Sequence, residues 1–177
     1  KTLCTLIFFP LILHHNMKRP PLLPIIIGTG FGSGFWPWGP GTAGALLATV
    51  MWSVLSFFLS SFTLFFVTLA LVIVLTALGT WATHRLMPLW GDGPSRVVAD
   101  EMVGVWIPLL ACPTLSEGGA AWGYCIAAFV LFRLFDIFKP LGIRKIDNMK
   151  GAFYVMADDI LAGIYSLIII IAARWAI

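Results

Sequence analysis

Carboxylate side chains stand inside three of the most apolar stretches of this sequence, where an ionised group is costly. They form two adjacent pairs and one single residue, namely Asp100, Glu101, Asp136, Asp158 and Asp159. Inserting one Asp at the centre of a membrane helix costs roughly 2.5–3.5 kcal/mol, and less near the interface. The nearby cations Arg133 and Lys139 can each neutralise only one carboxylate. The remaining negative charge predicts a bound cation.

The residue types indicate which cation such a site would take. All five carboxylates offer hard oxygen ligands, and neither His nor Cys stands beside them in the sequence. Such ligands favour Mg²⁺, which proteins bind through carboxylates, water and the phosphate of a substrate. We therefore expect the five carboxylates to make a Mg²⁺ site. Arg133 would hold a phosphate by its planar fork, and Lys139 would hold it as a point charge.

If the substrate is a phosphate ester, these residues have the groups that its cleavage needs. That reaction needs charge neutralisation on the phosphoryl oxygens and a nucleophile in line with the bond that breaks. One carboxylate would act as the base for an attacking water, and the candidates for catalysis are Asp100, Glu101 and Asp159. Direct attack by an aspartate, giving an aspartyl phosphate, is the alternative route.

Each acidic element also has a simpler interpretation. Arg133 and Asp136, three residues apart, could form only a local ion pair. Asp158 and Asp159 could be a proton relay in a transporter, and the acids at 100–101 could simply favour a helix N-terminus. An isolated ion pair does not explain why more carboxylates than cations lie at the same depth in these apolar segments.

The elements that must position these residues are apolar segments. Of the 177 residues, 60% are hydrophobic and 11% are charged, whereas soluble domains average roughly 25% charged residues. Apolar segments span residues 43–59, 62–82, 97–112, 119–135 and 152–173. The second and last suit a helix that crosses a bilayer, while the third could tilt or re-enter. We predict an all-α integral membrane protein with four to five transmembrane or re-entrant helices around a polar site.

Basic residues indicate how these segments are oriented. Lys and Arg precede the first segment and occur in the connections after the second and the fourth, whereas residues 60–61 and 113–118 contain none. If every segment crosses, the basic connections share one side, which the positive-inside rule makes cytoplasmic. The acidic residues lie at the same ends of their helices. We therefore expect a multi-pass protein of the cytoplasmic (inner) membrane with its active site facing the cytoplasm.

The chain reads as one membrane-embedded domain over residues 17–177. Residues 1–16 carry a short apolar run broken by Pro10, and Met17 looks like a natural start. We therefore interpret residues 1–16 as an upstream extension. No nucleic-acid partner is expected.

A glycine-rich stretch, GTGFGSGFWPWGPGTAG, covers residues 28–44. It fits neither the dinucleotide pattern GxGxxG nor the P-loop. Its GxxxG spacings are typical of close helix packing. The functional alternative is a loop whose free N–H groups bind phosphate beside a helix that begins near Thr42. On that hypothesis Gly41 and Thr42 bind substrate, and Thr42 acts as the helix N-cap or as a phosphate donor.

Four stretches of the sequence resemble the ordered motifs of the phosphatidylglycerophosphatase A family. They read GFGSG…PGTAGALLA, VADEMVGVWIPLLACP, FVLFRLFDIFKPLGIRKID and MADDILAGIYS, within roughly residues 28–166. The resemblance implies a Mg²⁺-dependent enzyme of the cytoplasmic membrane that converts phosphatidylglycerophosphate, an anionic phospholipid substrate, to phosphatidylglycerol. The functional residues it implies by motif position are Gly41, Thr42, Asp100, Glu101, Arg133, Asp136, Lys139, Asp158 and Asp159.

The chain departs from the family pattern at two positions. Lys150 precedes Gly151 where the family usually has two adjacent glycines, and Ala45 stands where a small hydroxyl residue is usual. Both departures bear on loop detail more than on the chemistry.

Two hypotheses from other classes compete with the phosphatase. A small ion- or proton-coupled transporter would use the same intramembrane carboxylates, but it predicts internal repeats, and none is found. A non-catalytic lipid-binding or assembly subunit would not need surplus carboxylates. Other phosphatase chemistries fit poorly, because the sequence has no CxxxxxR motif and no Asp-x-Asp pair.

Overall fold

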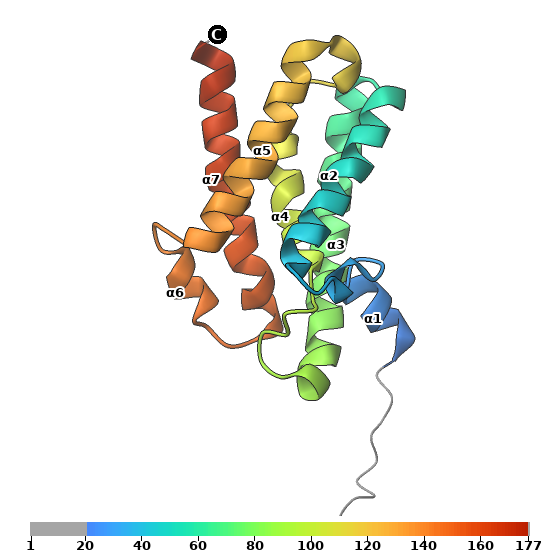
Figure 1. The fold of residues 1–177 in the computed structure, drawn as a ribbon, viewed down its shortest axis with the longest axis vertical. Coiled ribbons are helices and arrows are strands. Elements are labelled where there is room, and N and C mark those ends of the chain that lie inside the picture. The colour runs from blue at the N-terminus through green and yellow to red at the C-terminus, as the bar shows by residue number, and fades with distance from the viewer. Residues whose placement is uncertain (1–20, 177) are drawn as a thin grey trace, which may run out of the picture.

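Helices make up all the regular structure of residues 21–176, the part of the chain that the computed structural model describes. In chain order they are α1 (Leu22–Gly28), η1 (Ser33–Phe35), α2 (Pro40–Phe58), α3 (Ser61–Trp90), α4 (Ala99–Leu109), η2 (Leu115–Glu117), α5 (Gly119–Phe138), α6 (Ile143–Asp147) and α7 (Ala152–Ala176), as Figure 1 shows. The all-α prediction is confirmed. The interpretation of residues 1–16 falls outside the described residues.

Four helices, α2, α3, α5 and α7, are long and apolar enough to cross a membrane. Their outer surfaces carry exposed hydrophobic side chains such as Phe66, Ile73, Ile126 and Ile168. A water-soluble protein rarely exposes so much contiguous apolar surface, so the bundle is suited to a lipid environment. This confirms the prediction of a membrane protein.

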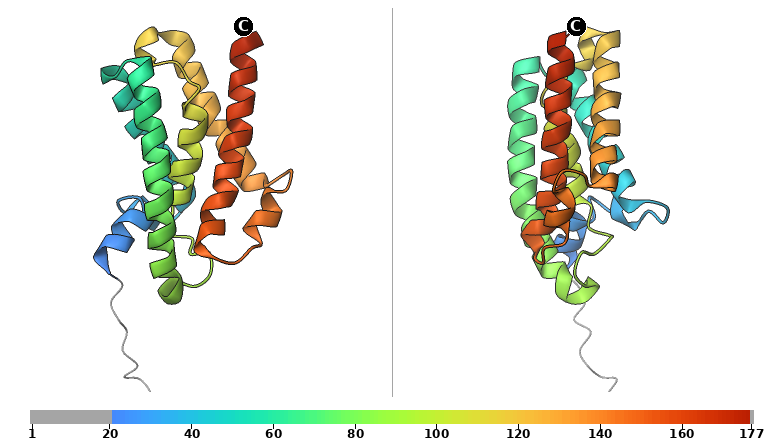
Figure 2. Two further views of the ribbon diagram at one scale, coloured as in Figure 1. Left: turned by 180° about the vertical axis from the view of Figure 1, so that it is seen from behind. Right: turned by 90° about the vertical axis from the view of Figure 1, so that its left-hand side faces the viewer.

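The third apolar segment forms a shorter helix than the others. At 1.5 Å per residue α4 rises about 16 Å, roughly half of a hydrocarbon core about 30 Å thick. Nearly every residue of α4 is buried, because the longer helices surround it. Figure 2 shows α4 between α3 and α5, and the indole of Trp106 donates a hydrogen bond to the Ala48 carbonyl of α2 at 2.9 Å.

The connection after α4 reaches the end of the bundle opposite to the start of α4. There the Ser61 hydroxyl, at the start of α3, donates to Glu117 Oε1 at 2.6 Å, and Arg174 near the end of α7 donates to the Ala111 carbonyl. The Thr114 hydroxyl also donates to Glu117 Oε1, at 2.7 Å. The hydrogen bonds from Ser61 and Thr114 lower the pKa of the Glu117 carboxyl. Taken with its connection, the third segment therefore runs from one end of the bundle to the other.

Two glycines allow α4 and α7 to cross closely. A Cβ atom at Gly163 of α7 would lie 2.5 Å from the Gly104 carbonyl oxygen of α4. A Cβ atom at Gly104 would lie 2.3 Å from Phe132 Cε2 of α5. Small residues at such crossings let helix backbones approach in a membrane protein. The glycine pair fixes α4 against α7, side by side and starting from the same end of the bundle (Figure 1).

Candidate active site

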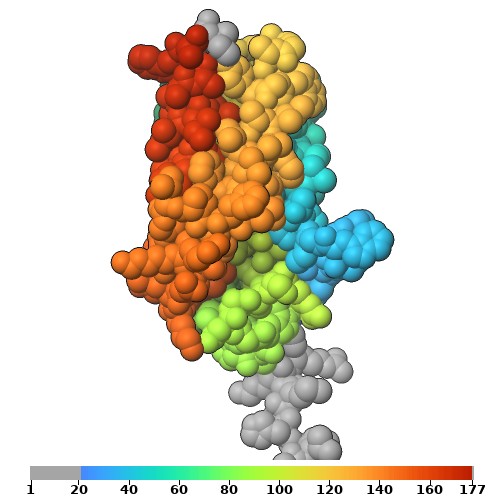
Figure 3. Space-filling view, turned by 60° about the vertical axis from the view of Figure 1, so that its left-hand side comes forward, coloured from blue at the N-terminus to red at the C-terminus, as the bar shows by residue number. Residues whose placement is uncertain are grey.

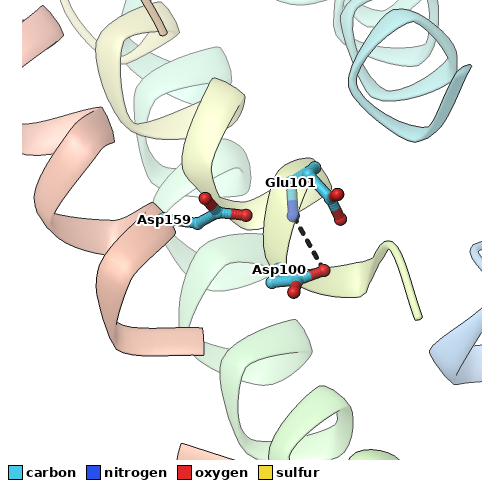
Figure 4. Close-up of side chains that lie close together, drawn as sticks. All are labelled: Asp100, Glu101 and Asp159. Carbon is cyan, nitrogen blue, oxygen red and sulfur yellow. Dashed lines mark hydrogen bonds between the residues drawn. The ribbon is translucent and has the colours of Figure 1, made fainter. Parts of the chain in front are cut away.

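Three carboxylates from α4 and α7 meet one helical turn from the glycine crossing. Asp100 lies four residues before Gly104, and Asp159 lies four residues before Gly163. Residues four apart lie on the same face of a helix, so the crossing also brings these acids together. One oxygen each from Asp100, Glu101 and Asp159 lies within 4.8 Å of the others. Figure 4 shows Asp159 on α7 facing the first turn of α4.

Burial makes this acidic cluster costly unless a cation joins it. Asp100 is 7% exposed and Asp159 is 3% exposed. Asp100 Oδ1 accepts one hydrogen bond, from the Glu101 N–H at 3.1 Å, whereas Glu101 Oε2 is buried and has no hydrogen-bond partner. Like charges in a low-dielectric site repel strongly. An oxygen-only donor set with an orphaned oxygen fits a hard divalent cation such as Mg²⁺.

Gly41 brings the start of α2 against this cluster. A Cβ atom at this position would lie 2.2 Å from Glu101 Oε1 and 3.3 Å from Arg133 Nη1. The missing side chain therefore leaves room for a carboxylate and a guanidinium at the N-terminus of α2. Arg133 Nη1 also donates to Asp136 Oδ2 at 2.5 Å, while Arg133 Nε is buried without a partner. The local ion pair considered for Arg133 and Asp136 is present, and it adjoins the acidic cluster.

Lys139 closes the other side of the site. It is the C-cap of α5, and its Nζ donates to Asp147 Oδ1 and to Asp158 Oδ2, both at 2.6 Å. Burial acts to lower the pKa of Lys139, but the hydrogen bonds and charges of the two aspartates outweigh burial and raise it. Lys139 is therefore held as a cation. Asp158 is buried, and its Oδ1 has no hydrogen-bond partner.

Asp147 belongs to this site, although the sequence analysis did not single it out. It ends α6, a helix of five residues, which is too short to leave a clear periodic pattern. One signal was available. Asp147 is the single acid in a connection that otherwise carries the basic residues Lys139, Arg144, Lys145 and Lys150.

A cavity of about 400 Å³ opens beside these residues. Figure 3 shows the surface hollowed between the orange segment that holds α6 and the green connection before α4. Its lining includes the two lysines Lys139 and Lys150. The carboxylates among its described lining residues are Asp92, Asp100, Glu101, Asp136, Asp147, Asp158 and Asp159. Seven acids and two lysines give a formal charge of −5, because 2 − 7 = −5.

The N–H groups of residues 30–36 are not free, so the hypothesis is wrong for this part of the glycine-rich stretch, whereas phosphate binding by the N–H groups at the start of α2 stays a prediction. Each N–H from residue 30 to residue 36 donates to a backbone carbonyl of residues 26–33. Positive φ angles at Gly30 and Gly32 let the chain fold back to make these bonds. Gly34 is closely packed instead, since a Cβ atom there would lie 2.1 Å from the Arg96 carbonyl oxygen, but this contact is with the connection before α4 and is not a GxxxG helix crossing.

Thr42 lies apart from the acidic cavity. Helix α2 begins at Pro40 with Gly39 as its N-cap and no side-chain cap, so the N-cap role considered for Thr42 is wrong. Proline at the first helical position needs no N–H partner and favours this earlier start. The Thr42 side chain is exposed and lines a separate groove with Trp36 and Trp38.

Fold and site together define a helical membrane protein with a deep acidic cavity at one end of its bundle. Comparison with known proteins then gives the family. The family model described as Phosphatidylglycerophosphatase A matches residues 26–174, and the chain belongs to this family. The protein is therefore a phosphatase, and the transporter hypothesis loses its support.

Three curated relatives align over most of the chain. A protein of Bacteroides thetaiotaomicron named "Putative phosphatidylinositol-3-phosphatase" is 58% identical over 161 residues, which are 91% of this chain and 99% of the relative. Phosphatidylglycerophosphatase A of Haemophilus influenzae is 38% identical, over 92% of this chain and 96% of its own. Phosphatidylglycerophosphatase A of Escherichia coli is 36% identical, over 80% and 77%. No solved structure matches the chain.

Proposed function

We propose that this protein is a Mg²⁺-dependent phosphatase that hydrolyses phosphatidylglycerophosphate to phosphatidylglycerol and phosphate. Family membership supports the reaction class. The observation that carries the proposal is the meeting of Asp100, Glu101 and Asp159 within 4.8 Å in a buried site. These carboxylates adjoin a cavity at one end of the bundle, where the head group of a membrane lipid could enter.

The charge of the cavity supports a requirement for metal. A phosphate monoester is an anion, and it would be repelled by a cavity whose lining carries a formal charge of −5. Asp100, Glu101 and Asp159 would hold Mg²⁺, and Asp136 and Asp158, which line the same cavity, would add ligands. When bound, Mg²⁺ would neutralise phosphoryl oxygens and make water easier to deprotonate.

The chain's own residues would bind the phosphate and move a proton. Arg133 and Lys139 would hold phosphoryl oxygens, the first through its partly free guanidinium and the second through its ammonium. Gly41 would bind substrate at the start of α2, where helix N–H groups favour anions, whereas the Thr42 side chain lines the separate groove with Trp36 and Trp38. One carboxylate among Asp100, Glu101 and Asp159 would take the proton from the attacking water. If an aspartate attacks phosphorus instead, an acyl phosphate should be trapped from labelled substrate.

The distribution of basic residues supports a cytoplasmic active site. The site end of the described structure carries the cations Arg85, Arg96, Lys139, Arg144, Lys145 and Lys150. The opposite end carries Arg174, near the end of α7. Under the positive-inside rule the site end faces the cytoplasm of the inner membrane.

Phosphatidylinositol 3-phosphate is the second candidate substrate, because the relative at 58% identity is named as a putative phosphatidylinositol-3-phosphatase. The two lipids differ in the alcohol that leaves, which is a primary glycerol hydroxyl in one and a ring hydroxyl of inositol in the other. A cavity of about 400 Å³ leaves room for either head group.

Phosphate release from the two lipids, measured side by side in detergent, tests the proposal. We expect kcat/KM for phosphatidylglycerophosphate to exceed that for phosphatidylinositol 3-phosphate by at least about tenfold, which corresponds to about 1.4 kcal/mol in transition-state binding. The reverse order would assign the second candidate. No release from either lipid would contradict the proposed lipid phosphatase.

A further inference from the structure

Asp147 makes a contact that the mechanism above does not use. Its Oδ1 accepts a hydrogen bond from Lys139 Nζ, which also donates to Asp158 Oδ2, both at 2.6 Å. The three residues come from the end of α5, from α6 and from α7, and all three line the cavity. One ammonium therefore joins three elements at the wall of the site.

The Lys139 ammonium retains capacity for one more acceptor. A lysine has three N–H donors and no acceptor, and the two aspartates use two of the three. The Lys139 side chain is 21% exposed, whereas that of Asp158 is 7% exposed. Asp147 is the more exposed partner, so it draws the ammonium outward from Asp158 and toward the cavity.

We propose that Asp147 is a positioning residue for the lipid phosphate. By sharing Lys139 with Asp158, it holds the ammonium at the cavity wall, where the third N–H can reach a phosphoryl oxygen. Without Asp147, the ammonium would be drawn to the buried Asp158 alone. This inference rests on the proposed function, because it needs a phosphate in the cavity.

The fold fixes Asp147 in this position. Ile143, in the same short helix, is completely buried, and Gly142 has φ +91°, which lets the chain turn directly into α6. The hydroxyl of Tyr165 on α7 donates to the Leu141 carbonyl at 3.0 Å. Helix α6 is thus anchored to α7, and it holds Asp147 in a fixed position beside Lys139.

The rival interpretation is that Asp147 only holds the connection between α5 and α7 together. In that case its removal would act independently of Lys139. A double-mutant cycle separates the two interpretations, because residues that act through one another give non-additive effects.

The experiment measures kcat/KM on whichever lipid monophosphate the wild-type protein hydrolyses, and the inhibition constant of inorganic phosphate. We expect Asp147→Ala to lower kcat/KM about tenfold and Lys139→Ala about a hundredfold, with the double variant within about threefold of Lys139→Ala. Asp147→Glu should restore most of the activity. The inhibition constant of phosphate should rise in both single variants. Lys145→Ala, an exposed change on the same helix, is the control and should match the wild type.

Two results would overturn the role of Asp147. One is a double variant reduced by the product of the single effects, about a thousandfold. The other is an unchanged inhibition constant for phosphate in Asp147→Ala. Lys139→Met, which keeps the apolar stem, replaces Lys139→Ala if that variant does not insert.

The wild-type assay separates the proposed function from the role of Asp147. An inactive wild type contradicts the proposed function and the inference together, whereas additivity in an active enzyme contradicts the inference alone.

Discussion

At the scale of single residues, the site is defined by too many carboxylates and too few cations. Asp100, Glu101 and Asp159 approach one another, although burial and mutual repulsion both oppose their ionisation. Lys139 is committed to Asp147 and Asp158, and Arg133 to Asp136. The protein therefore retains an acidic cluster that its own described side chains do not neutralise. Such a cluster is expected where an external cation completes the site.

Replacing Asp159 by its neutral isostere tests this cluster. We expect Asp159→Asn to lower phosphate release at least about a hundredfold, because the change removes a charged ligand or base without removing volume. Folding should be preserved, since less negative charge remains buried. The measurement is kcat in detergent together with the melting temperature. Glu117→Gln, at the opposite end of the bundle, is the matched control. Asp159→Asn with the activity of that control would refute the assignment.

The sequence predicted the residues of the acidic cluster better than their surroundings. Asp100, Glu101 and Asp159 could be found because charged groups in apolar helices stand out, and because the charge pattern placed them at one depth. Asp147 was missed, since its role depends on where a five-residue helix packs. The loop at residues 30–36 was misjudged, because the φ angles that consume its N–H groups are not visible in a list of glycines.

At the scale of elements, the glycine crossing of α4 and α7 positions the site. Gly104 and Gly163 bring two backbones together one turn from Asp100 and Asp159. Helix α4 is short and buried on all sides, so it carries no polar face to indicate its orientation in the bundle. The surrounding helices must therefore determine how its acidic end is presented.

A methyl group at the crossing should disturb the site. The Cβ atom added by Gly163→Ala would lie 2.5 Å from the Gly104 carbonyl oxygen, so the backbone must move. We expect a loss of about 1–3 kcal/mol in stability, as for other overpacked cores, and a clear loss of activity. Thermal unfolding and phosphate release measure the two effects.

Gly123→Ala is the control for that prediction. Gly123 also lies in a long helix, α5, but a Cβ atom there would meet no neighbour within 4 Å. Alanine favours a helix over glycine by about 1 kcal/mol, so this variant should be at least as stable as the wild type. If both variants behave alike, close packing at the crossing does not position the site.

Helix boundaries show what hydropathy alone can predict. The apolar segments at 119–135 and 152–173 correspond closely to α5 and α7, and the one at 62–82 to the first part of α3. Helix α3 continues to Trp90, past the apolar run, because a helix satisfies its own backbone in water as well as in lipid. Helix α4 ends at Leu109, short of the predicted 112, because the N–H groups of residues 110–112 bond to carbonyls three residues back and tighten the chain into a turn. The length of the third apolar segment alone could not decide whether that segment crosses the membrane or re-enters it.

At the scale of the whole molecule, the bundle has one strongly polar end and one weakly polar end. The cavity, its acids and most of the basic residues of the described structure share the first. The turn between α2 and α3 and the connection before α5 meet at the second, through Ser61 and Glu117. This asymmetry supports the proposed orientation, in which the strongly polar end faces the cytoplasm.

Single cysteines test that orientation. In a chain whose native cysteines are replaced, Ser116→Cys in η2 and Lys145→Cys in α6 place thiols on exposed residues at opposite ends. In intact cells a membrane-impermeant maleimide should label only Ser116→Cys. Lys145→Cys should react after permeabilisation. Labelling of Lys145→Cys from outside would place the active site on the other face of the membrane.

Binding of Mn²⁺ to protein stripped with EDTA, followed by its electron paramagnetic resonance signal, tests the central claim most directly. Mn²⁺ takes the same oxygen ligands as Mg²⁺. We predict that the wild-type protein binds Mn²⁺, that Mg²⁺ displaces it, and that Asp159→Asn weakens binding at least about tenfold, while Glu117→Gln has no effect. Equal Mn²⁺ affinity in the wild type and in Asp159→Asn, or full phosphate release from the stripped protein, would contradict the account.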